Sequence, residues 1–224
     1  MAELESGFLR QAEHCTKNGA PVTGKICKSM IRIVRGDSAV GQRIAAWPCH
    51  SCVLEDAVGL RIAGGIHNLH LTQKEDALDA VYAGAVTDQQ RIEDIVDAVV
   101  RRHEAELLPW LDNTPQTNEV GRAASFAAAF LWLSSQYGEC VSRLELNEIG
   151  SSGGLNLMMD QYHFTLGDTT FGPVGSTVRI RPKWSGSQLK PAPATPEIVR
   201  IRGCDISPVD LTLDRYVTGG LLLY

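Results

Sequence analysis

Apolar positions recur every three or four residues through roughly the first 137 residues, which is the period of an amphipathic helix. The strongest signal lies in residues 89–108, where Ile92, Val96 and Val99 share one face and charged residues take the others. Gly138 ends an Ala- and Phe-rich segment that begins near residue 120. The pattern predicts longer helices over residues 4–19, 21–34, 53–71, 89–108 and 120–137, with shorter ones over 39–45 and 76–82.

The hydrophobic period changes at residue 141. Residues 141–149 alternate apolar and polar side chains, which predicts a strand, and Gly150–Gly154 predicts a tight turn. A helix is expected over 155–160, a hairpin over 163–182 with its turn at Gly167 and Asp168, and a strand over 198–205. The sequence thus predicts an α/β protein, with a helical region at 1–138 and a strand-containing region at 139–224 that carries an insertion at about 163–196.

Composition is that of an ordinary globular chain. Of 224 residues, 44% are hydrophobic and 21% are charged, which excludes disordered and fibrous classes. The longest nearly uniform apolar run, residues 123–133, is shorter than the roughly 20 residues that span a bilayer. The first residues lack the pattern of a secretory signal, so we expect a cytoplasmic protein with no membrane association.

Charge is unevenly distributed. The net charge of −5 falls within residues 1–140, whereas 141–224 is balanced. A local excess of basic residues is able to hold an anion or a nucleic-acid phosphate. Aromatic residues do not alternate with these basic residues, so solvated strand faces are favoured and no nucleic-acid partner is expected. The excess consists of Arg179, Arg181, Lys183, Lys190, Arg200 and Arg202.

The six cysteines form no repeating framework, and free thiols are expected. Cys49 and Cys52 form a single Cys-x-x-Cys pair, for which zinc binding and thiol exchange are alternatives to a plain structural role. A zinc site needs further ligands, and the nearby candidates are His67 and His70. We favour the structural role and predict no metal site.

The strand, glycine-rich turn and helix around residue 150 carry the clearest chemistry. Glycines let a ligand approach the backbone, and a helix start offers unpaired N–H groups. The run from Glu148 to Gly154 resembles the first motif of Rossmann-like S-adenosylmethionine-dependent methyltransferases, in which an acid and an apolar residue precede G-x-G-x-G; Ser152 stands at the usual middle glycine. The resemblance implies cofactor-binding roles for Glu148, Gly150, Ser151, Ser152, Gly153, Gly154 and Asn156.

Asp205 follows the second predicted strand. In the same methyltransferases an acid at the end of the second strand binds the ribose hydroxyls of the cofactor, and the resemblance implies that role for Asp205. A carboxylate that accepts two hydroxyl hydrogen bonds is sound chemistry for such a site. The alternative is that Asp205 caps a turn at Ser207 and Pro208. With this second element, residues 139–224 are interpreted as an incomplete Rossmann-like unit.

Polar residues precede the helix at 120–137. Asn118, Glu119 and Arg122 either cap and pair at the start of that helix or lie at the mouth of the glycine-rich turn as substrate or second-layer contacts. Both interpretations remain open from the sequence.

Four segments in order resemble the bacterial family DUF2332, a family of unknown function. They are residues 8–15, 115–122, 148–157 and 202–205. Members of that family are longer, so the resemblance implies that this chain is C-terminally truncated and inactive. No catalytic residue is identified. The leading hypothesis is a small-molecule-binding, methyltransferase-like protein that uses S-adenosylmethionine. The alternatives are a non-catalytic ligand- or partner-binding protein and a different nucleotide-dependent enzyme.

Overall fold

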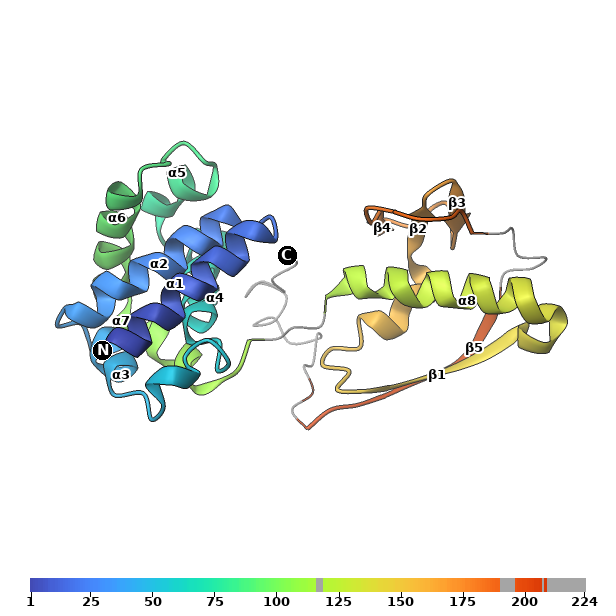
Figure 1. The fold of residues 1–224 in the computed structure, drawn as a ribbon, viewed down its shortest axis with the longest axis horizontal. Helices are drawn as coiled ribbons and strands as arrows, with labels where there is room; N and C mark the ends of the chain where they lie inside the picture. Colours follow the sequence, from blue (N-terminus) through green and yellow to red (C-terminus); the bar gives the residue numbers. More distant parts are fainter. Residues whose placement is uncertain (116–118, 190–195, 207, 209–224) are drawn as a thin grey trace. The chain divides into compact units, whose positions relative to one another are not determined.

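The structure is a computed structural model that describes residues 1–115, 119–189, 196–206 and 208 (Figure 1). Contacts divide the chain into two compact units, of which the first ends at Pro115 and the second begins at Gln116. We call them unit 1 and unit 2. The segment 120–137, which the sequence analysis grouped with the helical region, therefore belongs with the strands of unit 2.

Unit 1 consists of α-helices and short 3-10 helices. In chain order these are α1 (Ala2–Lys17), α2 (Pro21–Arg35), α3 (Ala39–Ala45), η1 (His50–Cys52), α4 (Val58–Leu71), η2 (Asp76–Leu78), α5 (Asp79–Tyr82), α6 (Gln89–Arg102), α7 (Glu104–Leu107) and η3 (Leu108–Asp112).

The predicted apolar faces of unit 1 form its core. Phe8 of α1, Met30 of α2 and Ile62 of α4 are each fully buried in one cluster. Local signals set the helix starts: Pro21 opens α2, and the Asp88 carboxylate accepts the Arg91 N–H at 2.8 Å to cap α6. The helical prediction for this region is confirmed.

Two predicted helices have different bounds. The helix expected from residue 53 begins at Val58, because Ala57 adopts a left-handed conformation with φ of 53° and interrupts the helix. The helix expected over 89–108 ends at Arg102. His103 leaves the helical conformation and its ring lies 3.2 Å from a Glu75 oxygen and 3.0 Å from a Glu106 oxygen.

The expectation of free thiols is wrong for Cys49 and Cys52, which form a disulfide in the turn between α3 and α4. A 3-10 turn places their Cα atoms 5.2 Å apart, within the range that a disulfide requires. Cys15, Cys27, Cys140 and Cys204 are free. His67 and His70 stack on Tyr82, and among the described residues no group of three His, Cys, Asp or Glu side chains is arranged to hold a metal.

Unit 2 combines one long helix with short strands. Its elements are η4 (Val120–Arg122), α8 (Ala123–Tyr137), η5 (Gly138–Val141), β1 (Arg143–Ile149), η6 (Asn156–Gln161), β2 (His163–Leu166), β3 (Thr169–Phe171), β4 (Arg179–Ile180) and β5 (Glu197–Cys204).

The strands of unit 2 form two small sheets. β1 and β5 pair in parallel, with Leu144 opposite Ile198, and a register shift follows that places Glu148 opposite Gly203. β2 pairs with β3 through the predicted hairpin and with β4 in parallel. Alanines of α8 pack in a cluster with Phe164, Leu146 and Ile198, so α8 contributes to one core with both sheets. The structure shows a mixed α/β unit, and the helix expected over 155–160 is instead the 3-10 helix η6.

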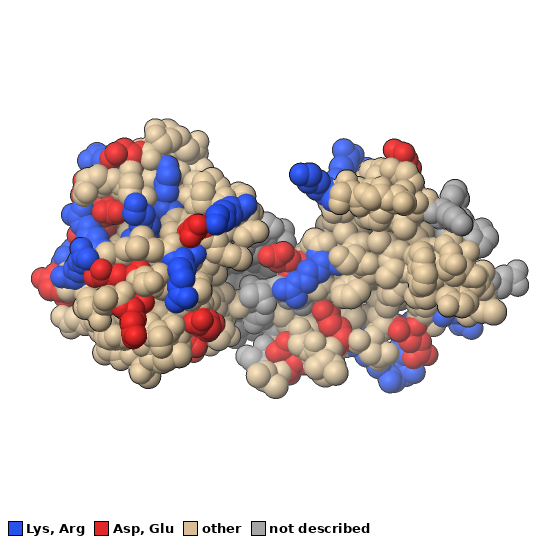
Figure 2. Space-filling model, in the orientation of Figure 1, with Lys and Arg blue, Asp and Glu red and all other residues tan. Residues whose placement is uncertain are grey.

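Charged side chains are unevenly distributed over the surface. Figure 2 shows Lys and Arg interspersed with Asp and Glu over unit 1, while the surface over α8 in unit 2 is mostly uncharged. Phe126, Trp132 and Tyr137 of α8 are exposed. No helix in the described part of the chain combines the length and apolarity needed to cross a membrane.

Within unit 1 we expect Glu75→Gln to lower the free energy of unfolding by about 1–3 kcal/mol near neutral pH. Burial raises the pKa of Glu75, but hydrogen bonds from Arg102 and His103 outweigh it and lower the pKa below its ordinary 4.5. The carboxylate therefore stabilises the fold above the ordinary pKa, and this contribution is lost as pH falls through the lowered pKa.

Urea unfolding at several pH values between neutral and strongly acidic measures this contribution. The difference between wild type and Glu75→Gln should shrink in acid. Glu13→Gln is the matched control, because Glu13 is exposed and pairs with the exposed Lys17 of its own helix. Equal unfolding curves for the two variants would show that the Glu75 contacts do not stabilise the fold.

Candidate functional site

The turn at residues 150–154 adopts an alternating backbone conformation. Gly150, Ser152 and Gly154 have φ values of 74°, 52° and 74°. These are the three glycine positions of the G-x-G-x-G pattern, and left-handed φ is the conformation that glycine adopts without steric cost. Ser152 occupies it although the conformation costs an L residue about 1–2 kcal/mol. The backbone of the turn thus explains why the pattern favours glycine at alternate positions.

The end of β5 holds this turn. The N–H groups of Gly150 and Ser151 donate to the Cys204 carbonyl at 2.8 Å and 3.2 Å. The Ser152 N–H donates to Oδ2 of Asp205 at 2.8 Å. The structure therefore brings Asp205 to the glycine-rich turn, where it caps the strained residue, while Ser207 of the alternative turn lies outside the described residues.

Glu148 lies at the end of β1, directly before the turn. Its Oε1 accepts a hydrogen bond from Nδ2 of the buried Asn156 at 3.2 Å. Its Oε2 is buried and has no hydrogen-bond partner among the described residues. Buried carboxylate oxygens are normally paired, so this position favours a ligand group that donates hydrogen bonds.

The segment after the turn is short. Met158 has non-helical φ and ψ values inside η6, and the Tyr162 hydroxyl donates to the Leu155 carbonyl at 2.6 Å. Burial, followed by the nearby Asp160, raises the pKa of Tyr162, which keeps this hydroxyl protonated. Because η6 is a short 3-10 segment that is interrupted at Met158, the helix dipole expected at the turn is small.

The start of α8 lies at the same end of unit 2 as the turn. α8 and β1 run in opposite directions (Figure 1). Their lengths match, because 15 helical residues and seven strand residues each span about 22–23 Å. Glu119 and Arg122 are exposed there, and the Arg122 N–H donates to the Glu119 carbonyl at 3.1 Å. Their role at the site stays a prediction, and Asn118 lies outside the described residues.

Gly203 is a site residue that the sequence analysis did not single out. A Cβ at this position would lie 2.5 Å from Oγ of Ser151 and 2.8 Å from Cδ1 of Leu157. The missing side chain allows β5 to approach the turn closely. The signal in the sequence was its position directly before Cys204 and Asp205, within the segment 202–205 that resembles the family.

The basic residues near the strands have local partners. Arg200 lies 4.0 Å from Glu145, and Arg143 lies 3.7 Å from Glu197. Arg179 donates to the Val174 carbonyl at 2.8 Å. These contacts support the solvated-face interpretation, and Lys190 lies outside the described residues.

Comparison with protein families gives a match over most of the chain. The family DUF2332, described as an uncharacterized protein conserved in bacteria, matches residues 5–217. The chain belongs to the DUF2332 family. No curated protein and no solved structure matches it. The match covers both units of this DUF2332 chain, including the turn and Asp205.

For the DUF2332 site we expect Gly203→Ala to destabilise unit 2 by about 1–3 kcal/mol, because the added methyl group overlaps Ser151 and Leu157. Gly175→Ala is the matched control, since a Cβ at that position has no heavy atom within 4 Å. Urea unfolding measures the stability, and hydrogen exchange of peptides from 143–161 localises the effect. Equal exchange in both variants would contradict the close approach of β5 to the turn.

Proposed function

We propose that unit 2 is a methyltransferase-like, S-adenosylmethionine-binding domain, with its site at the turn 150–154. The observation that supports this is the combination of left-handed φ at the three motif positions with a neighbouring parallel strand whose terminal Asp205 bonds to the turn. In open α/β sheets, ligands bind beyond the carboxyl ends of parallel strands.

The residues at this edge suit the cofactor in two ways. Asp205 lies at this edge beside the Ser152 N–H, and a carboxylate is the kind of group that binds a ribose diol by accepting hydrogen bonds from its hydroxyls. The buried Oε2 of Glu148 favours a hydrogen-bond donor, and the ammonium group of the cofactor's amino-acid part is such a donor. Ser151, Gly153 and Asn156 complete the proposed binding segment, with Glu119 and Arg122 as candidate substrate contacts.

S-adenosylmethionine would supply an electrophilic methyl group. Methyl transfer depends mainly on in-line positioning, so the proposal requires no dedicated acid or base. Among the described residues two parallel strands, β1 and β5, contribute to this edge, whereas acceptor groups in such folds come from further strands. We therefore expect this chain to bind the cofactor without measurable methyl transfer, which is also the behaviour of a non-catalytic ligand-binding domain.

Calorimetric titration of the chain with S-adenosylmethionine and S-adenosylhomocysteine tests the proposal. Asp205→Asn keeps an oxygen that accepts the Ser152 N–H but removes the charge that binds the diol. We expect it to weaken binding by about tenfold or more. Asp168→Asn is the control, because Asp168 lies in the exposed β2–β3 turn.

Absence of heat on titration of the folded wild-type chain would overturn the proposal. Binding of NAD(H) in place of S-adenosylmethionine would select a different nucleotide-dependent protein. Equal affinities of the two aspartate variants would remove Asp205 from the site.

A further inference from the structure

The disulfide between Cys49 and Cys52 lies in a short turn of unit 1 and belongs to none of the elements named at the site of unit 2. The 3-10 helix η1 joins the two cysteines, and the Cys52 N–H donates to the Cys49 carbonyl at 3.1 Å. Two residues separate the cysteines, so the bond restricts the unfolded chain less than a long-range disulfide does. A large structural benefit is therefore not the reason for this bond.

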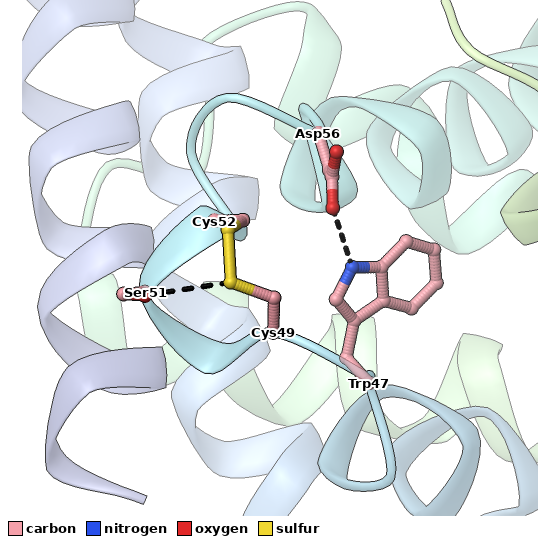
Figure 3. The surroundings of a disulfide bond; sticks show 5 residues. All are labelled: Trp47, Cys49, Ser51, Cys52 and Asp56. Atoms are coloured by element: carbon pink, nitrogen blue, oxygen red, sulfur yellow. Dashed lines mark hydrogen bonds between the residues drawn. A yellow bond between two sulfur atoms is a disulfide. The ribbon is translucent and has the colours of Figure 1, made fainter.

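Other contacts hold the turn independently of the disulfide. Nε1 of Trp47 donates to Oδ2 of Asp56 at 2.8 Å, which closes the segment on both sides of the cysteines (Figure 3). Val53, next to Cys52, is 1% exposed and packs against Gly7 of α1. The ring of His50 bonds to the Ala45 carbonyl at 2.8 Å. None of these contacts involves the sulfur atoms, so the turn is able to persist in both oxidation states.

One of the two cysteines borders a surface cavity. Cys49 lines a surface cavity of about 330 Å³, and Cys52 is not among the lining residues. The cavity lies between the end of α3 and the disulfide, and both cysteines are half-buried. A thiol that enters it meets Cys49 first. The lining residues are Arg43, Ala46, Trp47, Pro48, Cys49 and Asp56.

Polar side chains surround Cys49. A disulfide sulfur has no hydrogen to donate, so the Ser51 hydroxyl donates to Sγ of Cys49 at 3.4 Å. The same bond stabilises negative charge on that sulfur after reduction. Arg43 and Asp56 place one charge of each sign at the cavity. Arg43 also pairs with Asp112 at 2.6 Å, and Asp56 accepts the Trp47 N–H.

We propose that Cys49 and Cys52 form a redox-active couple that exchanges two electrons with a dithiol reductant at this cavity. A thiolate of the dithiol attacks Sγ of Cys49, which forms a mixed disulfide and breaks the Cys49–Cys52 bond. Cys52 leaves as a thiolate and takes up a proton. The second thiol of the reductant then loses its proton and attacks the first sulfur of the reductant, which is bonded to Cys49 in the mixed disulfide. The bond to Cys49 breaks, and Cys49 leaves as a thiolate and takes up a proton. The reductant becomes a disulfide and the protein a dithiol.

Equilibration of the full chain in mixtures of reduced and oxidised dithiothreitol tests the couple. Alkylation and peptide mapping report Cys49 and Cys52 separately from the exposed thiols of Cys140 and Cys204. We expect a reversible two-electron transition while circular dichroism shows that the protein stays folded. A bond that resists reduction until the protein unfolds, or reduced cysteines that do not reoxidise, would overturn the proposal.

Trapping with oxidised glutathione tests the direction of attack. Cys52→Ser leaves Cys49 at the cavity and should accumulate glutathione on Cys49. Cys49→Ser is the matched variant and should form about tenfold less adduct on Cys52. Ser51→Ala should slow adduct formation at Cys49 severalfold in the Cys52→Ser background. Equal trapping in the two cysteine variants would contradict Cys49 as the attacked sulfur.

Discussion

Parallel pairing of β1 with β5 brings the glycine-rich turn and Asp205 to one edge, although a long stretch of chain separates them. Parallel neighbours cannot be joined by a hairpin, so the chain between them must cross over, and it does so through η6 and the sheet of β2, β3 and β4. The bulge after Leu144 is as important as the pairing. If the register of Leu144 and Ile198 continued unchanged, Arg202 would stand opposite Glu148. A shift of one residue also exchanges the two faces of a strand. With the bulge, Gly203 takes that place and β5 is able to contact the turn.

Sequence periodicity predicted the helices of unit 1, both long strands of unit 2 and the β2–β3 hairpin, because these depend on repeating burial along one element. It failed where a single residue departs from its local preference. Ala57 takes a left-handed conformation that its residue type does not signal. The helix expected after the turn becomes 3-10 because Met158 is non-helical and the Tyr162 hydroxyl bonds to the Leu155 carbonyl. Strand register depends on a partner far along the chain, so periodicity alone did not reveal the close approach at Gly203. The Cys-x-x-Cys spacing is compatible with a disulfide and with free thiols, so the spacing did not decide the state of Cys49 and Cys52.

The two candidate sites share one physical device. In each, an aspartate side chain holds a tight turn that carries reactive or binding groups: Asp56 through the indole of Trp47, and Asp205 through the Ser152 N–H. A carboxylate that accepts a well-directed N–H bond fixes a turn without filling the space beside it. The geometry of each turn is therefore set by a residue that does not itself need to react.

The space that Gly203 leaves is filled by Ser151 and Leu157. A side chain at position 203 and one at position 151 compete for the same volume, so the two positions are not independent. Within the family, a residue larger than glycine at 203 should therefore occur together with glycine at 151, and the pair should vary jointly. The distance between β5 and the turn would then be recorded in related sequences as a correlation between two positions that lie far apart along the chain.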